Sequence, residues 1–410
     1  MIEAICEDLK HRCTGCEACK FACPCSCIEM VFDEEGFAFP SIDDSACVSC
    51  ETCIRVCPNN RAPECESLAG AWSFQENGDS AMRSSSGGAF HALGLNMIEQ
   101  GGAVYGFAFD GVFVVMRRSD NEADLDWLRG SKYVQGSIGG SYRQIEQDIA
   151  RGIPVAVCGT ACQIAGLRSY LGDLSKEVLL IDLVCHGVPS PKMFERHVSY
   201  LEHRYEDDLV EFVFRDKRRT HWLMSKHFLY RFARGGDVDG GWRLDPYYNA
   251  YLKGLTMREC CYRCPYSTAE RCSDLTLCDF WGAEKVPRTV DRRIGVSALI
   301  AHTEKGRKSA AQLAAYGVLN EIEVHEVVNG NPNLERPTNR PEARDCVYAD
   351  ISRMGYDSWA KRQVSLKDRV LSKIFDLIPL CAVEPLQKLR GCGRSTVSYT
   401  HLTLPTILLV

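Results

Sequence analysis

The feature that most constrains the fold is a run of four cysteines that occurs twice near the N-terminus. Residues 13–24 read CTGCEACKFACP and residues 47–58 read CVSCETCIRVCP, so both runs have the spacing C-x2-C-x2-C-x3-C-P. Three closely spaced cysteines can wrap one iron–sulfur cluster, and the fourth, before proline, ligates the other cluster in two-cluster ferredoxins. The repeat therefore predicts two [4Fe-4S] clusters with crossed ligands.

Crossed ligation divides the eight cysteines into two sets and ties both halves of the segment together. The first set is Cys13, Cys16, Cys19 and Cys57, and the second set is Cys47, Cys50, Cys53 and Cys23. The clusters would stabilise a small α+β domain over residues 1–65 that has too little core to fold alone. Residues 28–43 are expected to form a hairpin around Glu35-Gly36. The cysteines at positions 6, 25, 27 and 65 fit neither run and are interpreted as bystanders.

Composition restricts the alternatives. The chain has 410 residues and 23 cysteines, and it shows no signal-peptide zones and no apolar run of about 18 residues. A secreted disulfide scaffold would be shorter, and zinc sites usually use two separated C-x2-C pairs, so zinc is the weaker interpretation. The net charge of −6 gives no indication of a nucleic-acid partner. We therefore expect a cytoplasmic protein without a membrane span.

Residues 66–83 are polar and irregular and are predicted to be a linker. The following segment, SSSGGAFHALGLNMIEQ at 84–100, is predicted to be a helix that opens with small hydroxyl and glycine residues. Such a helix start can bind an anion, often a cofactor phosphate, but the spacing alone favours a plain capped helix after a loop. Neither G-x-G-x-x-G after a strand nor a P-loop is present.

The next segments alternate between strands and helices. Residues 102–118 are predicted to be two strands joined at Asp110-Gly111. Strands are predicted at 153–159 and 177–187, and helices at 141–152, at 160–172 and from Ser190-Pro191 onward. This alternation predicts an α/β domain with a largely parallel sheet, whose ligands sit beyond the carboxyl ends of the strands.

A further four-thiolate site is possible in this second domain. Cys162 and Cys185 each follow a predicted strand, and residues 258–282 contain five cysteines, of which Cys261 and Cys264 form a C-x2-C pair. Two cysteines of this loop together with Cys162 and Cys185 would make a third cluster. A zinc site or a group of free buried thiols remain alternatives at this stage.

Several of these motifs occur in an order that resembles one family. SSSGGAF, GTACQIAGLR, DLVCHGVPSP, FRDK and a cysteine-rich segment that ends in DFWG resemble the coenzyme F420 hydrogenase/dehydrogenase beta-subunit family over roughly residues 8–390. The resemblance implies a two-cluster ferredoxin domain ahead of an α/β FAD-binding domain at 84–390. It also implies a third [4Fe-4S] cluster, held by the third set: Cys162, Cys185, Cys261 and Cys264.

The resemblance further implies a flavin site and shows some departures from the family pattern. The residues implied at the FAD site are Ser85, Ser86, Gly87, Gly88, Lys132 and Tyr133. Ala161 replaces the usual proline of its turn, Cys278 replaces the glycine before DFWG, and Cys260 doubles the first cysteine of its loop. The two extra cysteines leave open which residues ligate the third cluster.

The predicted function is that of an iron–sulfur flavoprotein oxidoreductase. It would transfer electrons between a ferredoxin-like donor and a two-electron acceptor, coenzyme F420 or a similar conjugated compound. The alternatives are a non-catalytic electron-transfer subunit that serves a partner redox enzyme, and a zinc-binding interaction protein. Expected partners are a redox protein and a small-molecule acceptor. No catalytic residue is assigned.

The final residues, TVSYTHLTLPTILLV at 396–410, do not continue the preceding pattern. Read back into codons, TVSYTHLTLPT matches a transposase mosaic-end adapter that is used to prepare sequencing libraries. These residues are therefore predicted to be a non-native tail.

Overall fold

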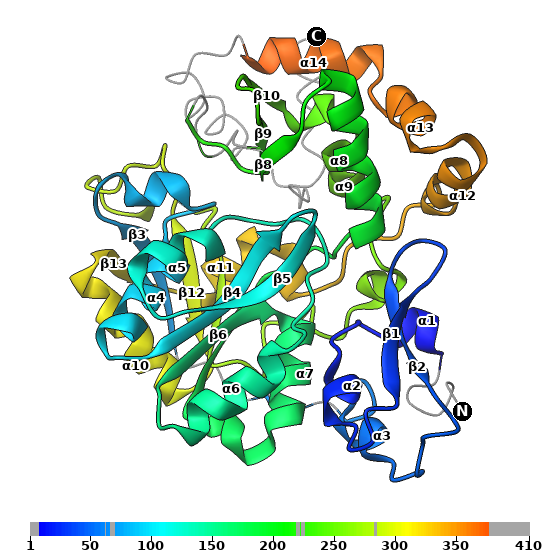
Figure 1. Ribbon diagram of the computed structural model, residues 1–410. Helices are drawn as coiled ribbons and strands as arrows, with labels where there is room; N and C mark the ends of the chain where they lie inside the picture. Colours follow the sequence, from blue (N-terminus) through cyan, green and yellow to red (C-terminus); the bar gives the residue numbers. More distant parts are fainter. Residues whose placement is uncertain are drawn as a thin grey trace. The chain divides into compact units, whose positions relative to one another are not determined.

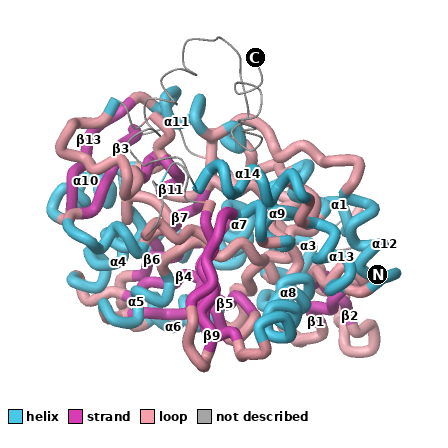
Figure 2. The backbone as a smooth tube through the Cα atoms, turned by 90° about the horizontal axis from the view of Figure 1, so that it is seen from above, coloured by secondary structure: helices cyan, strands magenta, loops and turns pink. Residues whose placement is uncertain are grey.

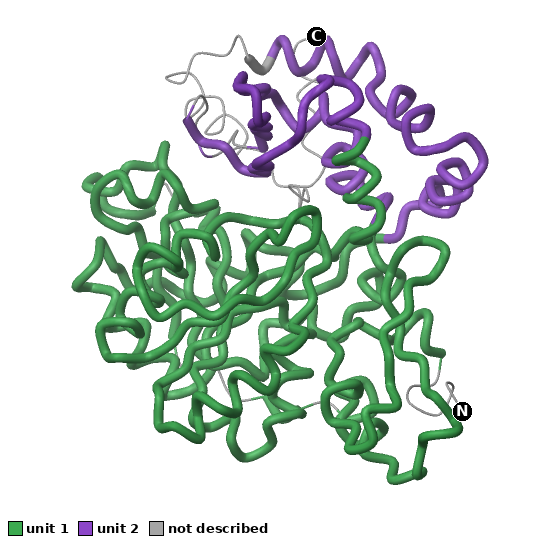
Figure 3. The backbone as a smooth tube through the Cα atoms, in the orientation of Figure 1, with its two compact units in different colours: residues 1–199, 257–339 green, residues 200–256, 340–410 purple. Residues whose placement is uncertain are grey.

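The computed structural model describes residues 8–61, 63–65, 70–218, 222, 226–282 and 285–376. The chain divides into two compact units, residues 1–199 with 257–339 and residues 200–256 with 340–410 (Figure 3). The predicted non-native tail lies outside the described residues. In the described part of the chain, no helix is both long and apolar enough to cross a membrane.

The N-terminal region of the first unit contains both cysteine runs. Its elements are α1 (Leu9–Arg12), α2 (Ala18–Ala22), β1 (Ile28–Phe32), β2 (Ala38–Ile42) and α3 (Thr52–Val56). The two strands pair antiparallel, which confirms the predicted hairpin. Gly36 lies in the connecting turn with φ +84°, a conformation that side chains with a Cβ rarely adopt. Each cysteine run contributes one short helix (Figure 1).

The remainder of the first unit is built on an eight-stranded mixed sheet. In spatial order the strands are β13 (Gly317–Ile322), β3 (Gly70–Glu76), β12 (Ser297–Ala301), β11 (Leu275–Asp279), β7 (Val178–Leu183), β6 (Val155–Thr160), β4 (Ala103–Asp110) and β5 (Phe113–Ser119). The expectation of a largely parallel sheet is correct only for the centre, where β11, β7, β6 and β4 run parallel. The outer pairs are antiparallel: β4 and β5 form a hairpin, and β12 is antiparallel to β11 and β3, which in turn is antiparallel to β13.

The linker predicted at 66–83 is wrong over its described part. Residues 70–76 form β3, which pairs with β12 and β13, and η2 (Gly78–Arg83) follows it as a 3-10 helix. The burial of Phe74 and Ser73 shows why this segment is structural. The sequence GAWSFQE alternates weakly and mixes polar with apolar residues, so the segment did not resemble a strand that is covered on both faces.

Helices cover both faces of the sheet. Successive residues of β6 point to opposite faces and pack against different helices. Val155 and Val157 pack into a core with residues of α6 and α7, whereas Ala156 and Cys158 point to the opposite face and pack with α4 and α10. The core on the α6/α7 face also contains buried residues of the N-terminal region. The helices of this unit outside the N-terminal region are α4 (Ala89–Glu99), α5 (Glu122–Leu128), α6 (Ser141–Ala150), α7 (Ala161–Leu171), the first part of α8 (Pro191–Tyr205), α10 (Glu304–Gln312) and α11 (Val324–Gly330).

Short 3-10 helices connect several of these elements, and most of the sequence-based assignments between 84 and 205 are confirmed. The 3-10 helices are η3 (Gly172–Glu177), η6 (Glu259–Arg263), η8 (Leu313–Ala315) and η9 (Pro332–Leu334). The strands and helices predicted in this stretch lie within two residues of those in the structure at most ends. An exception is the strand predicted at 177–187, which ends at Leu183, so Cys185 lies in the loop beyond it.

The second unit contains a three-stranded antiparallel sheet and a group of helices. Its strands, in the order β10-β9-β8, are Asp237–Gly241, His227–Phe232 and Leu209–Val213. Its helices are the end of α8, η5 (Trp242–Leu244), α9 (Pro246–Leu252), α12 (Arg344–Met354), α13 (Tyr356–Gln363) and α14 (Leu366–Asp376). Figure 2 shows β9 beside the tube of α14 and α9 in a second orientation. Asp245 caps α9 by accepting a hydrogen bond from the Tyr248 amide.

Candidate iron–sulfur and flavin sites

The first set of cysteines comes together around α2. Burial raises the pKa of Cys19 most, and the thiols of Cys16, Cys13 and Cys57 raise it further. These three neighbours are the residues that the crossed pattern predicts for the same cluster. Cys16, Cys19 and Cys57 are buried and Cys13 is half-buried. Four thiols that oppose one another's ionisation in a buried site are suited to a cationic iron centre, which favours their thiolate forms.

The two cysteine runs share the same unusual backbone conformation. Gly15 and Ser49 stand at the third position of each run with φ +67° and +53°, and Glu17 and Glu51 at the fifth with φ +69° and +60°. Left-handed conformations are uncommon for residues with a side chain and cost free energy, so their repetition indicates a shared requirement. One result is that the Gly15 amide donates to the Cys13 sulfur at 3.4 Å. N–H donors of this kind hold and tune cluster sulfurs.

The second set is the more exposed one. Cys50 is exposed, Cys47 and Cys53 are half-buried, and Cys23 is buried. Burial raises the pKa of Cys53 most, and Cys23 and Cys50 are among the further causes. The neighbouring Val48 is 65% exposed, so this end of the N-terminal region is accessible to a partner protein.

Cys27 is a residue whose place the sequence did not reveal. Its sulfur lies 3.4 Å from that of Cys23, and a hydrogen bond to Cys23 is the largest cause that raises the pKa of Cys27, to about 12; Cys47 also contributes. Cys27 therefore lies against the second set. The only sequence signal was its position four residues after a predicted ligand.

The third set assembles from three separate segments. Thr160 begins α7 with a capping box, and Cys162 lies in the first turn of that helix, where the helix dipole favours negative charge. Burial raises the pKa of Cys162 most, followed by Cys264, and Cys185 and Cys261 raise it too. The Gly187 amide donates to the Cys185 sulfur at 3.3 Å. The structure thus places together the four cysteines that the resemblance indicated.

The two extra cysteines of 258–282 have different surroundings. Cys278 lies within β11, and after burial its pKa responds to Asp279, Arg271 and Asp182 rather than to the third set. Cys260 is buried and forms a hydrogen bond with the Cys261 thiol, which raises the pKa of Cys261. Cys260 therefore contacts a thiol of the third set, whereas Cys278 lies on β11 beside β7, the strand that leads to Cys185.

The spacing of the grouped thiols bears on the zinc alternative. Zn–S bonds of about 2.3 Å in a tetrahedron bring sulfurs within about 3.8 Å of one another. Among the described residues, no group of three or more His, Cys, Asp or Glu side chains is arranged to hold a single metal ion.

The first set lies against the helix that carries Cys162. The Tyr142 hydroxyl donates to the Cys16 carbonyl at 2.6 Å, and Tyr142 is completely buried. A Cβ on Gly166 of α7 would lie 2.7 Å from the Cys16 sulfur, so only glycine allows this close approach. The pKa of Cys16 is raised by burial and, among smaller causes, by Cys162. The first and third sets are therefore adjacent within one unit.

The residues expected at the flavin lie at the same edge of the sheet. β3 runs in the same direction as β11, β7 and β6, because β12 between β3 and β11 is antiparallel to both. The loop after β3, which holds Ser85 to Gly88, therefore leaves the sheet at the edge where Cys162 and Cys185 follow their strands. The hydroxyl and amide of Ser131 donate to the Ser85 hydroxyl at 2.8 and 2.7 Å, which joins this loop to the segment of Lys132 and Tyr133.

The residues of this loop already have contacts within the protein. The Ser86 hydroxyl donates to the Val296 carbonyl at 2.8 Å, so it has a protein partner already. A Cβ on Gly87 would lie 2.2 Å from the Phe74 carbonyl, which explains this glycine by packing. Glu76, His91 and Arg129 form a buried charged group beside this loop: the Arg129 guanidinium lies 3.5 Å from Glu76 Oε2, and His91 Nδ1 lies 2.6 Å from Glu76 Oε1. This group has its own protein partners and gives no separate indication of a flavin.

Comparison with known proteins identifies the class first. Residues 12–60 match the family model "4Fe-4S dicluster domain", so the N-terminal region is an iron–sulfur domain. Residues 154–327 match the family model for the C-terminal part of the coenzyme F420 hydrogenase/dehydrogenase beta subunit. Residues 154–327 therefore resemble the C-terminal part of the coenzyme F420 hydrogenase/dehydrogenase beta subunit, and they follow a dicluster domain in the same chain. The two matches agree with the family resemblance of the sequence and support iron–sulfur electron transfer.

A similar chain occurs in a solved structure of a xenon derivative of the F420-reducing [NiFe] hydrogenase complex from Methanosarcina barkeri. The alignment has 13% identity and a TM-score of 0.41, and it covers 75% of this chain and 93% of that one. No match was found among curated proteins.

Proposed function

We propose that this chain is an iron–sulfur flavoprotein oxidoreductase that transfers electrons between a ferredoxin-like donor and a two-electron acceptor, coenzyme F420 or a similar conjugated compound. The observation that carries the proposal is the grouping of the third set at the sheet edge that also holds the segments expected at the flavin. A dicluster domain alone needs no such additional thiol group.

Each group of residues would have a separate role. The first, second and third sets would each hold one [4Fe-4S] cluster, and the loop with Ser85 to Gly88 and the segment with Lys132 and Tyr133 would hold FAD. Bound clusters supply one-electron chemistry, and bound FAD supplies the exchange between one- and two-electron steps. The chain itself buries the first set, donates the Gly15 and Gly187 amides to sulfur, and leaves Cys50 accessible at the surface. An exposed second set supports a redox protein as the electron-transfer partner.

The alternative is a non-catalytic electron-transfer subunit without flavin. It is favoured by the internal hydrogen bonds of Ser85 and Ser86, since these hydroxyls are already occupied. Flavin content separates the two possibilities, because a relay of electrons through clusters alone requires no FAD.

The proposal predicts about 12 irons and one FAD per chain in protein purified without oxygen. Cys162→Ser is expected to reduce the iron content to about 8, because it removes a ligand of only the third set. Cys346→Ser is the matched control, since Cys346 is exposed on α12. Iron and flavin are measured by colorimetric assay and by absorbance after denaturation. About 8 irons without flavin in the parent chain, or unchanged iron in Cys162→Ser, would contradict the flavoenzyme proposal.

Lys132 predicts a pH-dependent change in stability. Burial lowers the pKa of Lys132 to about 7, although Cys158 opposes the shift, and the ammonium donates to the Arg129 carbonyl at 2.7 Å. A lowered pKa means that the unfolded chain binds more protons between pH 7 and the usual lysine pKa, so stability rises with pH across that range. Lys132→Met removes the charge that is unfavourable below pH 7.

The change in melting temperature caused by Lys132→Met is therefore expected to be more positive at pH 6 than at pH 10. Differential scanning fluorimetry at both pH values measures it, with Lys308→Met on the exposed side of α10 as the control. Equal changes at the two pH values would show that Lys132 is not desolvated.

A further inference from the structure

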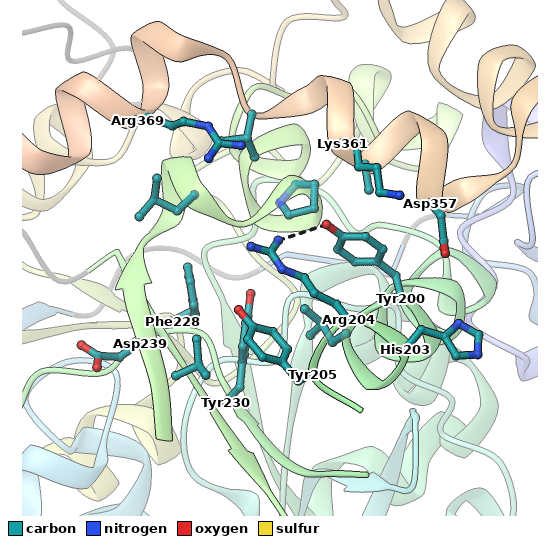
Figure 4. A pocket seen from close by; sticks show the side chains of 16 residues that line it. Tyr200, His203, Arg204, Tyr205, Phe228, Tyr230, Asp239, Asp357, Lys361 and Arg369 are labelled. Atoms are coloured by element: carbon teal, nitrogen blue, oxygen red, sulfur yellow. Dashed lines mark hydrogen bonds between the residues drawn. The ribbon is translucent and has the colours of Figure 1, made fainter. Parts of the chain in front are cut away.

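A large and a small cavity of the described chain differ in what lines them. The large one, about 610 Å³, lies in the second unit, where Figure 4 shows the Arg204 guanidinium beside the Tyr200 hydroxyl, to which it donates at 3.1 Å. The Phe228 and Tyr230 rings in its lining are buried and stack with their centroids 4.3 Å apart, so they face each other and not a ligand. The large cavity therefore indicates no particular ligand.

The small cavity lies in the N-terminal region and is lined by thiols. Its lining includes all four cysteines of the second set and two further cysteines, Cys25 and Cys27. Cys25 is exposed, whereas Cys27 is buried. One [4Fe-4S] cluster takes four thiolate ligands, so this cavity has more thiols than the predicted cluster needs.

The buried extra thiol, Cys27, contacts two cysteines of the second set. Its sulfur lies 3.4 Å from the Cys23 sulfur, and it also forms a hydrogen bond with the Cys47 thiol. The Asp43 amide donates to the Cys27 carbonyl at 2.8 Å, which fixes this residue directly before β1. The Ser26 amide closes the turn between the two cysteines by donating to the Cys23 carbonyl at 3.2 Å. The backbone therefore holds both thiols at the same cavity.

A buried free cysteine is often only a small apolar side chain, and Cys27 does pack in a core with Ile28. An apolar residue would fill that role equally well, but only a thiol can replace a thiolate ligand. A move of 3.4 Å brings the Cys27 sulfur to the position of the Cys23 sulfur. Such a move needs a change of side-chain rotamer and little movement of the backbone.

We propose that Cys27 is an alternative fourth ligand of the second cluster and takes the place of Cys23 where that residue is lost. Cys47, Cys50 and Cys53 are ligands in both arrangements. The inference rests on the proposed role of the second set as cluster ligands, and it requires neither a flavin nor a third cluster.

The exchange of ligands is balanced without an oxidant or a reductant. The bond between iron and the Cys23 sulfur breaks, and a bond between the same iron and the Cys27 sulfur forms. The proton of the Cys27 thiol passes to the Cys23 sulfur, so no electron is gained or lost. Cys23 is the ligand in the parent chain, because its sulfur accepts hydrogen bonds from the backbone of Cys25, Ser26 and Cys27, which stabilise a thiolate.

The test measures iron in the full chain purified without oxygen, and it uses alanine so that no oxygen ligand is introduced. Cys23→Ala and Cys27→Ala are each expected to keep the iron content of the parent chain. Cys23→Ala combined with Cys27→Ala is expected to lose about 1–4 irons per chain, because one iron of the cluster then has no protein ligand. The EPR spin count after reduction, which counts [4Fe-4S] clusters directly, is expected to follow the same order.

A matched control removes the same number of thiols from the same turn. Cys23→Ala combined with Cys25→Ala leaves Cys27 in place and is expected to keep the iron content of Cys23→Ala. Loss of iron or of soluble protein in Cys23→Ala would overturn the proposal, and so would equal iron contents in Cys23→Ala and its combination with Cys27→Ala. A parent chain with fewer than about 8 irons would overturn the assignment of the two clusters itself, and this inference with it.

Discussion

Arg271→Met is expected to lower the free energy of unfolding by about 3–5 kcal/mol near pH 8, because it leaves a buried carboxylate without its cation. Asp182 is completely buried in β7 and Arg271 is 3% exposed. The Arg271 guanidinium lies 3.5 Å from one oxygen of Asp182, and the Thr276 hydroxyl donates to the other at 2.6 Å. Removing one partner lowers the free energy of unfolding by more than the intact pair adds to it. The reason is that the remaining charge stays buried without a counter-charge.

The loss should depend on pH in a defined direction. Burial raises the pKa of Asp182 even though Arg271 and Thr276 lower it, so the folded chain holds this proton more tightly than the unfolded chain. The stability that protonation contributes is present at low pH and is lost as the pH rises through the folded pKa. Without Arg271 that pKa rises further, and the variant should be closer to the parent protein at pH 5 than at pH 8. Anaerobic chemical denaturation at both pH values measures the difference.

A double variant distinguishes a charge effect from a packing effect. Asp182→Asn combined with Arg271→Met removes both charges and is expected to be more stable than Arg271→Met alone at pH 8. Arg307→Met removes an exposed arginine that pairs with Glu304, and it should change stability by less than about 1 kcal/mol. If the double variant is no more stable than Arg271→Met, the role of Arg271 is packing rather than neutralisation of Asp182.

The sequence predicted those parts of the molecule whose chemistry is local. The paired cysteine runs predicted an iron–sulfur region because the spacing of their cysteines is the spacing that cluster ligation requires. Gly36 marked the turn of the hairpin between the two runs. Strands β6 and β7 were recognisable because both their faces are covered, which produces short continuous apolar runs. The conformations shared by Glu17 and Glu51 were not predictable, since nothing in glutamate favours a positive φ.

The parts that were missed depend on contacts between distant segments. β3 was assigned to a linker because its neighbours, β12 and β13, come more than 200 residues later. The pair of Asp182 and Arg271 joins residues 89 positions apart, so neither residue indicated the other. The residues alone raised a third four-thiolate site as one of several alternatives. The resemblance selected its four cysteines, since spacing along the chain does not show that Cys162 lies near Cys261. Contacts between residues far apart along the chain leave no local pattern in the sequence, so these pairings were not predictable.

Arg258→Met is expected to loosen the N-terminal region from the sheet and to lower the free energy of unfolding by about 3 kcal/mol. Arg258 is 1% exposed, and its guanidinium donates to the Cys13 carbonyl at 2.7 Å, to the Ala38 carbonyl at 3.0 Å and to Gln135 Oε1 at 3.2 Å. It also lies 4.0 Å from the centre of the Phe39 ring. One side chain thus joins the first cysteine run and β2 to the loop that carries Cys261 and Cys264.

The measurement is the rate of iron release to a chelator, compared with limited proteolysis of the N-terminal region. Both are expected to increase in Arg258→Met, and Arg258→Lys should fall between the variant and the parent, because an ammonium cannot reach three acceptors from one planar fork. Arg263→Met is the control, since Arg263 lies on the same 3-10 helix η6 and is exposed. Faster iron release in Arg263→Met than in Arg258→Met would mean that the loop itself, and not the bridge through Arg258, holds the two cysteine-bearing regions together.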